Sequence, residues 1–210
     1  SNLAYLTLSG NSLTNITLLS DMTELYRLTL SYNSLTTIDI PSNLTRLYQL
    51  SLDNNLLTTI DIPSGLTLMN ELYLQGNLLS GFTSKSGWTS LHYLYLFNNN
   101  MTIQSNLDNT LVSIDQNWTT NWGVIRLEGG GNVAPTGIGL TAKNNLLARS
   151  INITTTLAEA TFRVVNVSAG STNYQMQGNG QIDIDWGDGV TGTTTLTNSW
   201  ESNYHTYSSS

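Results

Sequence analysis

A step of 22 residues runs through the first half of the chain and constrains its fold more than any other feature. Residues 25–66 contain nearly the same sequence twice: LYRLTLSYNSLTTIDIPSNLTRLYQLSLDNNLLTTIDIPSGL. Asparagines recur at this step, at Asn11, Asn33, Asn55, Asn77 and Asn99. Each is the N of a segment of the form L-x-x-L-x-L-x-x-N-x-L, in which Met69 and Met101 replace leucine. A fixed period of this kind predicts repeated units that each pack on their neighbours.

The frame resembles that of leucine-rich repeat proteins, and the resemblance implies a parallel sheet on the concave side of a solenoid. The leucines of L-x-L should point inward and the residues between them outward, because side chains alternate along a strand. The asparagine column should turn the chain and bind backbone groups that the curve leaves unpaired. Pro41 and Pro63 interrupt the segments between the strands, so the convex side should be extended or a short 3₁₀ turn.

The period breaks after Asn99, because Leu94 finds its next equivalent at Ile125, 31 positions later. Apolar residues within the insertion recur at helical spacing, at Ile103, Leu107, Leu111, Ile114 and Trp118. We predict a helix there, capped by Ser105 or Asn106, with Asp108 in its first turn. Gly130 occupies the next asparagine position, and a second short helix over Thr141–Arg149 should cover the end of the core. These features predict about six strands in a solenoid over residues 1–150.

From Ile151 the pattern changes to alternation in threonine-rich segments, which predicts an all-β domain over residues 151–210. Its motifs are W-G-D-G at Trp186, Gly187, Asp188 and Gly189, and H-x-Y at His205, Thr206 and Tyr207. They resemble PKD and related immunoglobulin-like β-sandwich modules, which continue with a G-x-Y-x-V strand. This chain ends in SSS instead. The fold class expected is therefore a leucine-rich repeat solenoid, mostly non-helical on its convex side with one helical coil, followed by a truncated β-sandwich.

Composition excludes several classes of function. The chain has 7 Lys and Arg residues and a net charge of -7, which leaves no basic stripe for a nucleic acid. No segment approaches the roughly 20 apolar residues of a membrane span. We therefore expect neither nucleic-acid binding nor direct membrane insertion. The first residues, SNLAYLTLSG, lack the pattern of a signal peptide, so a signal for export would lie outside these residues.

Residues suited to catalysis or metal binding are few. His92 and His205 are the only histidines and there is no cysteine, so neither a nucleophile set nor a zinc site is indicated. We expect no enzymatic activity and no cofactor. Asp183, Asp185 and Asp188 are weak candidates for binding Ca²⁺. Their spacing departs from that of an EF-hand, and the last of them is expected to bond turn amides instead.

The outward positions of the predicted strands provide the best candidate site. The first rows are mostly small and polar, whereas the fourth and fifth bring four aromatic residues together: Tyr73, Tyr93, Tyr95 and Phe97. Glu71 and Gln75 could supply hydrogen bonds beside them. Clustered aromatics of this kind are typical of recognition sites for proteins or sugars. The alternative is that they stiffen the sheet or contact a neighbouring domain.

The order of solenoid, helical coil, glycine-rich closure and W-G-D-G module is similar to surface proteins of Bacteroidetes-type bacteria and to fibre or adhesin proteins of their phages. The resemblance implies a non-enzymatic recognition or adhesion module on a cell or virion surface, outside the cell. It would bind a protein or glycan through the concave face. The alternative is a structural spacer or assembly subunit of a fibre, in which other copies or domains are the partners.

Overall fold

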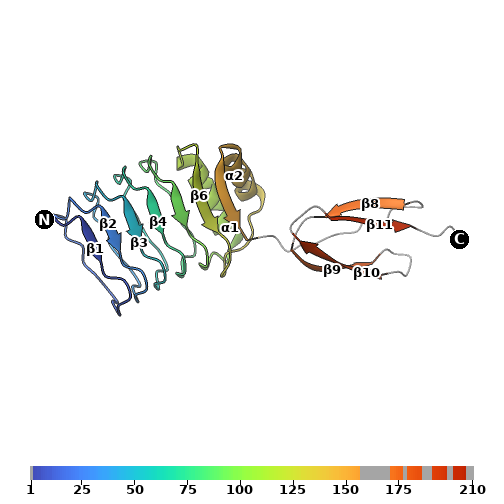
Figure 1. Ribbon diagram of the computed structural model, residues 1–210, viewed down its shortest axis with the longest axis horizontal. Helices are drawn as coiled ribbons and strands as arrows, with labels where there is room; N and C mark the ends of the chain where they lie inside the picture. Colours follow the sequence, from blue (N-terminus) through green and yellow to red (C-terminus); the bar gives the residue numbers. More distant parts are fainter. Residues whose placement is uncertain (1, 157–170, 177–178, 186–190, 198–200, 207–210) are drawn as a thin grey trace. The chain divides into compact units, whose positions relative to one another are not determined.

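The computed structural model describes residues 2–156, 171–176, 179–185, 191–197 and 201–206. They fall in two compact units, Ser1–Thr156 and Leu157–Ser210. The first unit is a solenoid in which the chain returns to the same sheet once per coil (Figure 1).

The solenoid is built on one parallel sheet of seven strands that follow one another in sequence order. The strands are β1 (Tyr5–Thr7), β2 (Arg27–Thr29), β3 (Gln49–Ser51), β4 (Glu71–Tyr73), β5 (Tyr93–Tyr95), β6 (Gly123–Leu127) and β7 (Ile151–Thr155). Their register places Leu28 between Leu6 and Leu50, and the same column continues to Ile125 and Ile153. This column is buried from β2 onward, which confirms the inward positions expected from the repeat.

The asparagine column forms a ladder of side-chain hydrogen bonds between successive coils. Asn55 is typical: its Nδ2 donates to the carbonyl oxygens of Leu30 and Leu52, each at 3.0 Å, and its Oδ1 accepts from the backbone N–H of Leu35 at 3.0 Å. Asn33, Asn77 and Asn99 repeat these contacts. The polar groups left by each turn are therefore satisfied within the core, as predicted.

The sixth member of the ladder is Asn132 and not Gly130. Asn132 donates to the carbonyl oxygens of Leu96 and Leu127, and its Oδ1 accepts from the backbone N–H of Met101. Gly130 does pair with Asn99 through an isolated bridge, so the backbone keeps its register there. A glycine has no side-chain amide to form these bonds. The asparagine two residues later, Asn132, takes this position in the ladder.

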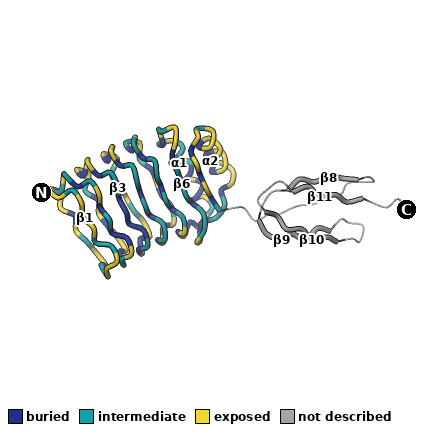
Figure 2. The backbone as a smooth tube through the Cα atoms, in the orientation of Figure 1, coloured by how far each residue is buried: buried dark blue, intermediate teal, exposed yellow. Residues whose placement is uncertain are grey.

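The core lies between the sheet and the segments that join its strands (Figure 2). In the first coils these segments consist of turns and extended chain, as the prolines predict. They contribute further columns to the core, including Ile38 and Phe82, and Leu44, Leu66 and Trp88. The coils from β2 onward thus bury most of the same positions, whereas Leu6, Leu8 and Leu13 of the first coil are only partly buried.

Two helices replace the extended segments at the end of the solenoid: α1 (Gln104–Asn117) and α2 (Gly137–Ala148). The expected capping of α1 by Ser105 or Asn106 is wrong, because the N-cap is Ile103, which has no capping side chain. Asp108 lies beyond the first turn and is buried. Its carboxylate accepts from the backbone N–H and the hydroxyl of Thr136, each at 3.0 Å, and so binds the N-terminus of α2.

The last strand of the sheet corrects the expected domain boundary at Ile151. Residues Ile151–Thr155 pair in parallel with β6, and Ile151 and Ile153 are buried in the solenoid core. The pattern I-N-I-T-T alternates as any half-buried strand does, so alternation alone did not show which sheet it joins. The solenoid therefore extends to Thr156 and has seven strands instead of six.

The described residues of the second unit form four strands in two antiparallel pairs. β9 (Asn179–Asp185) pairs with β10 (Thr191–Thr197), and β8 (Ser171–Met176) pairs with β11 (Glu201–Thr206). The backbone of Asp183 and Asp185 belongs to β9, whereas Asp188 and the W-G-D-G segment, 186–189, lie outside the described residues. Of the H-x-Y motif, His205 and Thr206 belong to β11 and Tyr207 lies outside. The sandwich and the Ca²⁺ site remain predictions.

Candidate functional site

The predicted aromatic residues lie on adjacent strands of the concave face, which we define as the side of the sheet that points away from the core. Register pairs Tyr73 of β4 with Tyr95 of β5, and Glu71 with Tyr93. Phe97 follows β5 by two residues, on the same side as Tyr95. All four aromatic side chains are half-buried instead of fully exposed. The structure therefore brings the predicted residues onto one surface, but their rings already have neighbours.

Three of these rings form a contiguous group, which we call the tyrosine cluster: Tyr73, Tyr95 and Phe97. The rings of Tyr73 and Tyr95 meet edge to face, with centroids 5.1 Å apart and an interplanar angle of 72°. Phe97 is tilted against Tyr95 at 6.0 Å. Both separations are within the range in which aromatic pairs attract. The cluster is thus packed before any partner arrives, which fixes its side chains.

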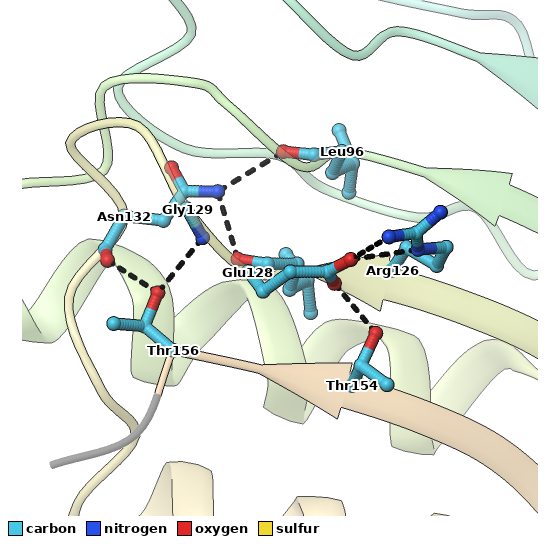
Figure 3. A network of polar contacts seen from close by, with 8 residues as sticks. Leu96, Arg126, Glu128, Gly129, Asn132, Thr154 and Thr156 are labelled. Atoms are coloured by element: carbon cyan, nitrogen blue, oxygen red, sulfur yellow. Dashed lines mark hydrogen bonds and ion pairs between the residues drawn. The ribbon is translucent and has the colours of Figure 1, made fainter. Parts of the chain in front are cut away.

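Arg126 of β6 covers part of the tyrosine cluster. Its guanidinium carbon lies 4.5 Å from the ring centroid of Phe97 and 5.8 Å from that of Tyr95, within the range of a cation–π contact. Its Nε donates to Oε1 of Glu128 at 2.7 Å, and its Nη2 donates to the same oxygen (Figure 3). This contact was not predicted from the sequence, although Arg126 occupies the outward position next to Tyr95.

Glu128 is held by hydrogen bonds from side chains of two strands, Arg126 of β6 and Thr154 of β7. The hydroxyl of Thr154 on β7 donates to its Oε2 at 2.5 Å (Figure 3). Burial by itself would raise the pKa of this carboxyl, but the hydrogen bonds from Thr154, from its own backbone and from Arg126 lower it below its ordinary value. Glu128 therefore stays ionised and neutralises Arg126 on this side of the sheet.

The two polar candidates beside the cluster differ in their contacts. The hydroxyl of Tyr73 donates to Oε2 of Glu71 at 3.1 Å. Burial first, and then the Glu71 carboxylate, raise the pKa of the Tyr73 phenol well above its ordinary value, so this hydroxyl remains a donor. Gln75 has a buried Oε1 that accepts no hydrogen bond from the residues that the structure describes. The cluster thus has one satisfied and one unsatisfied polar neighbour.

The polar rows of the first strands are less exposed than the repeat pattern suggests. Ser51 occupies an outward position of β3, but it is only 4% exposed and its Oγ accepts from Nε2 of Gln49 at 2.9 Å. Ser31 donates to Oδ1 of Asp53 at 2.5 Å, and both are buried. Small side chains in the middle of a sheet are covered by their larger neighbours. An outward position is therefore not the same as a free one.

A second aromatic group lies at the N-terminal edge of β5 and β6. Trp122, just before β6, stacks on His92 with centroids 3.9 Å apart and an interplanar angle of 30°. Tyr93 meets Trp122 edge to face at 6.2 Å and so belongs to this group. Trp122 remains 54% exposed. Trp122 was not among the residues predicted from the sequence, although the shift of 31 residues aligns it with Leu91.

His92 has polar contacts that fix the orientation of its ring. Nδ1 of His92 lies 2.8 Å from Nδ2 of Asn70 and 2.7 Å from the carbonyl oxygen of Ser90. These contacts, with the stacked indole, orient the imidazole as a support for Trp122.

In the part of the chain that the structure describes, no helix is long and apolar enough to span a membrane.

Comparison with known proteins gives one match. The family model of the BspA type leucine-rich repeat region matches residues 5–104 in six copies. This span contains β1 to β5, so the regular coils are similar to leucine-rich repeats of this type, which suggests a protein-binding, surface-type region. A search of curated proteins found no match.

Proposed function

We propose that this chain is a non-enzymatic recognition module of a cell or virion surface, which binds a partner through the concave face of its solenoid. The observation that supports the proposal most strongly is the tyrosine cluster on β4 and β5. The same positions on the first three strands have threonine and serine, so the repeat itself does not require aromatics there.

The arrangement of the cluster suits binding in three ways. Its rings are ordered by one another and by Arg126, so a partner loses little side-chain entropy by docking on them. Tyrosine and arginine are the residue types most often found at the energetic centre of protein interfaces. Gln75 adds an acceptor that lacks a donor. Solenoids of stacked repeats generally bind through such an extended face.

The location outside the cell is part of the proposal. It is supported by the match of residues 5–104 to a repeat region typical of surface proteins, and by a surface rich in threonine, asparagine and serine with few charges. Immunoblotting of fractionated source cells or purified virions would test it. Recovery of the protein only from the cytosol would contradict it.

Substitution of Tyr95 tests the proposed site, because this ring touches both other members of the cluster. Tyr95→Ala should weaken attachment to host cells, or to an array of extracellular proteins and glycans, by about 1 to 3 kcal/mol. Tyr5→Ala is the matched control, since Tyr5 is an exposed tyrosine on the same face at β1. It should leave binding within about 0.5 kcal/mol of the wild type.

The melting temperature of each variant shows whether the fold is intact. Equal binding by Tyr95→Ala and the wild type, or contacts mapped only to the second unit, would place the site elsewhere.

The internal contacts of the cluster favour a second candidate function, a structural spacer or assembly subunit. Tyr73 already bonds Glu71, and Arg126 already covers Phe97, so these residues could stiffen the sheet without a ligand. Light scattering after size-exclusion chromatography separates the two functions. A monomer that binds a partner supports recognition, whereas ordered oligomers whose assembly Tyr95→Ala abolishes support the spacer.

A further inference from the structure

Trp122 is exposed at a position where the repeat requires a buried residue. The equivalent residues of four earlier coils, Leu25, Leu47, Met69 and Leu91, are at most 2% exposed. Trp122 is 54% exposed. The core at this level is filled instead by Trp118 from the end of α1, which is 4% exposed. Packing of the solenoid therefore accounts for Trp118 but not for an indole on the surface.

The indole of Trp122 is held by a ring stacked on one of its faces and by the loop that precedes it. His92 stacks on it at 3.9 Å, and the His92 ring is fixed by Asn70 and Ser90. The loop before it is closed by Thr120, whose hydroxyl lies 3.0 Å from the carbonyl oxygen of Trp122 and 3.3 Å from that of Leu91. A side chain that is exposed and yet fixed is prepared for contact, since its rotamer entropy is already lost.

The backbone next to the indole shows the same close fit. A Cβ atom added at Gly123 would lie 2.7 Å from Cζ2 of Trp118 and 2.8 Å from the carbonyl oxygen of His92. Residue 123 must therefore remain glycine for Trp118 to fill the core while the preceding residue turns outward. The buried and the exposed tryptophan are two parts of one local arrangement.

From this geometry we infer that Trp122 is a stacking platform for an uncharged carbohydrate, and that it extends the proposed recognition site to the N-terminal edge of β5 and β6. The inference rests on the proposed function, because it names the chemistry of a ligand for the same concave face. The ligand would place one face of a pyranose ring on the indole and its rim hydroxyls toward Tyr93 and His92.

The class of ligand follows from the shape and charge of the platform. One face of a pyranose presents C–H groups, which suit the electron-rich face of an aromatic ring. Side chains of a protein partner typically anchor in pockets. An open pocket of about 410 Å³ lies elsewhere, between convex segments and α1, and is lined by residues that include Phe82 and Thr110. A flat ring that is supported from behind by His92 suits a flat ligand.

Charge also favours an uncharged ligand. Arg126 of β6 and Glu128 just after it neutralise each other. Glu71, which pairs with Tyr93 in register, accepts a hydrogen bond from the Tyr73 hydroxyl. An aromatic cage for an ammonium ligand sets several ring faces around one gap. Tyr93 instead lies at 81° to the indole, in an edge-to-face contact with it. The tyrosine cluster differs from Trp122 here, because Arg126 covers its Phe97 ring.

Nuclear magnetic resonance of the whole chain tests this inference. The indole N–H signal of Trp122, assigned from its absence in Trp122→Phe, is followed during titration with cellohexaose, maltohexaose, chitohexaose and mannohexaose. At least one of these should shift it saturably, with a Kd in the millimolar range, while the signals of the buried Trp88 and Trp118 stay in place. Trp122→Ala should bind that sugar at least about tenfold more weakly. Trp122→Tyr, which keeps a ring, should retain part of the affinity.

Three results would overturn the inference: no shift with any of the four sugars, equal sugar affinity in Trp122→Ala, or a shift by tetramethylammonium instead. The melting temperature of Trp122→Ala should match the wild type, because the side chain is exposed. The Tyr95→Ala experiment separates this inference from the proposed function. Loss of the partner by Tyr95→Ala with no sugar response at Trp122 refutes the carbohydrate platform alone. Sugar binding at Trp122 with no effect of Tyr95→Ala refutes the tyrosine cluster as the centre of recognition.

Discussion

The five regular coils and the last two coils of the solenoid use the same sheet in different ways. In β1 to β5 the step is constant, and each coil repeats the buried leucines and the asparagine bonds of the one before it. Between β5 and β6 nine extra residues introduce α1, the buried Trp118 and the exposed Trp122. The regular coils show which contacts stabilise the repeat. The irregular coils contain residues, such as the exposed Trp122, that the packing of the repeat does not explain.

The candidate site lies where these two regions meet. Tyr95 and Phe97 come from the last regular coil, whereas Arg126, Glu128 and Trp122 come from the first irregular one. The asparagine ladder crosses this junction without a gap through Asn132. The insertion therefore alters the surface of the sheet and leaves its internal hydrogen bonds in place.

The largest expected effect tests whether the regular coils provide the stability. Leu50 is fully buried between the coils of β2 and β4. Leu50→Ala should lower the free energy of unfolding by about 2 to 5 kcal/mol, because it leaves a cavity in a continuous core. Leu56→Ala in the same coil is the control, since Leu56 is 45% exposed, and it should cost less than about 1 kcal/mol. Chemical denaturation measures both, and equal losses would contradict the inward and outward assignment.

A smaller effect tests whether the irregular coils can unfold separately. Asp108 binds Thr136 at the start of α2 and accepts from Nε2 of Gln104 at 3.1 Å. Asp108→Ala should cost about 1 to 3 kcal/mol, because buried donors lose their acceptor. Asp108→Asn keeps one acceptor, the amide oxygen, and should lower the free energy of unfolding by less.

Hydrogen exchange in these variants locates the effect. The amides of α2 should exchange faster in Asp108→Ala, while those of the strands β2 to β4 stay protected. Equal acceleration in both regions would show that the solenoid unfolds as one unit, which would contradict separate unfolding of the irregular coils.

The smallest effect concerns an irregular residue inside the regular region. Tyr32 has a left-handed backbone with φ of 55° and is 64% exposed, whereas the same position in neighbouring coils is Gly10, Asn54, Gly76 or Asn98. Tyr32→Asn should raise stability by about 1 kcal/mol, since asparagine tolerates this conformation better than a bulky residue. Tyr32→Ala keeps the Cβ atom and should gain less. A lower denaturation midpoint in Tyr32→Asn would show that the tyrosine makes a stabilising contact.

Most of the solenoid could be predicted from its sequence because the columns of the repeat have a physical cause. Leu28, Leu50 and Leu72 are inward and Asn55 turns the chain, as the period indicates. The seventh strand was assigned to the wrong domain because a short alternating segment does not specify its partner strand. Asn132 was missed because two extra residues in the glycine-rich turn shift it out of the expected position.

The candidate site was predicted only in part, because a repeat pattern gives the direction of a side chain and not its neighbours. Tyr73, Tyr95 and Phe97 do meet, but Tyr93 contacts Trp122 instead, and Arg126 covers part of the cluster. The exposure of Ser51 depends on the size of the residues beside it. Trp122 could have been found from the sequence. The shift of 31 aligns it with the buried column of Leu91, and a second tryptophan, Trp118, lies close enough in the sequence to fill the core in its place.

The asparagine ladder has a consequence for how such arrays lengthen and shorten in evolution. Each amide bonds backbone groups of its own coil and of the preceding one. Duplication or deletion of 22 residues between nearly identical segments, such as 25–46 and 47–68, therefore joins a complete set of donors to a complete set of acceptors. Unequal recombination between such repeats yields chains with every turn still bonded, so the length of the array can change by whole coils in a single genetic event.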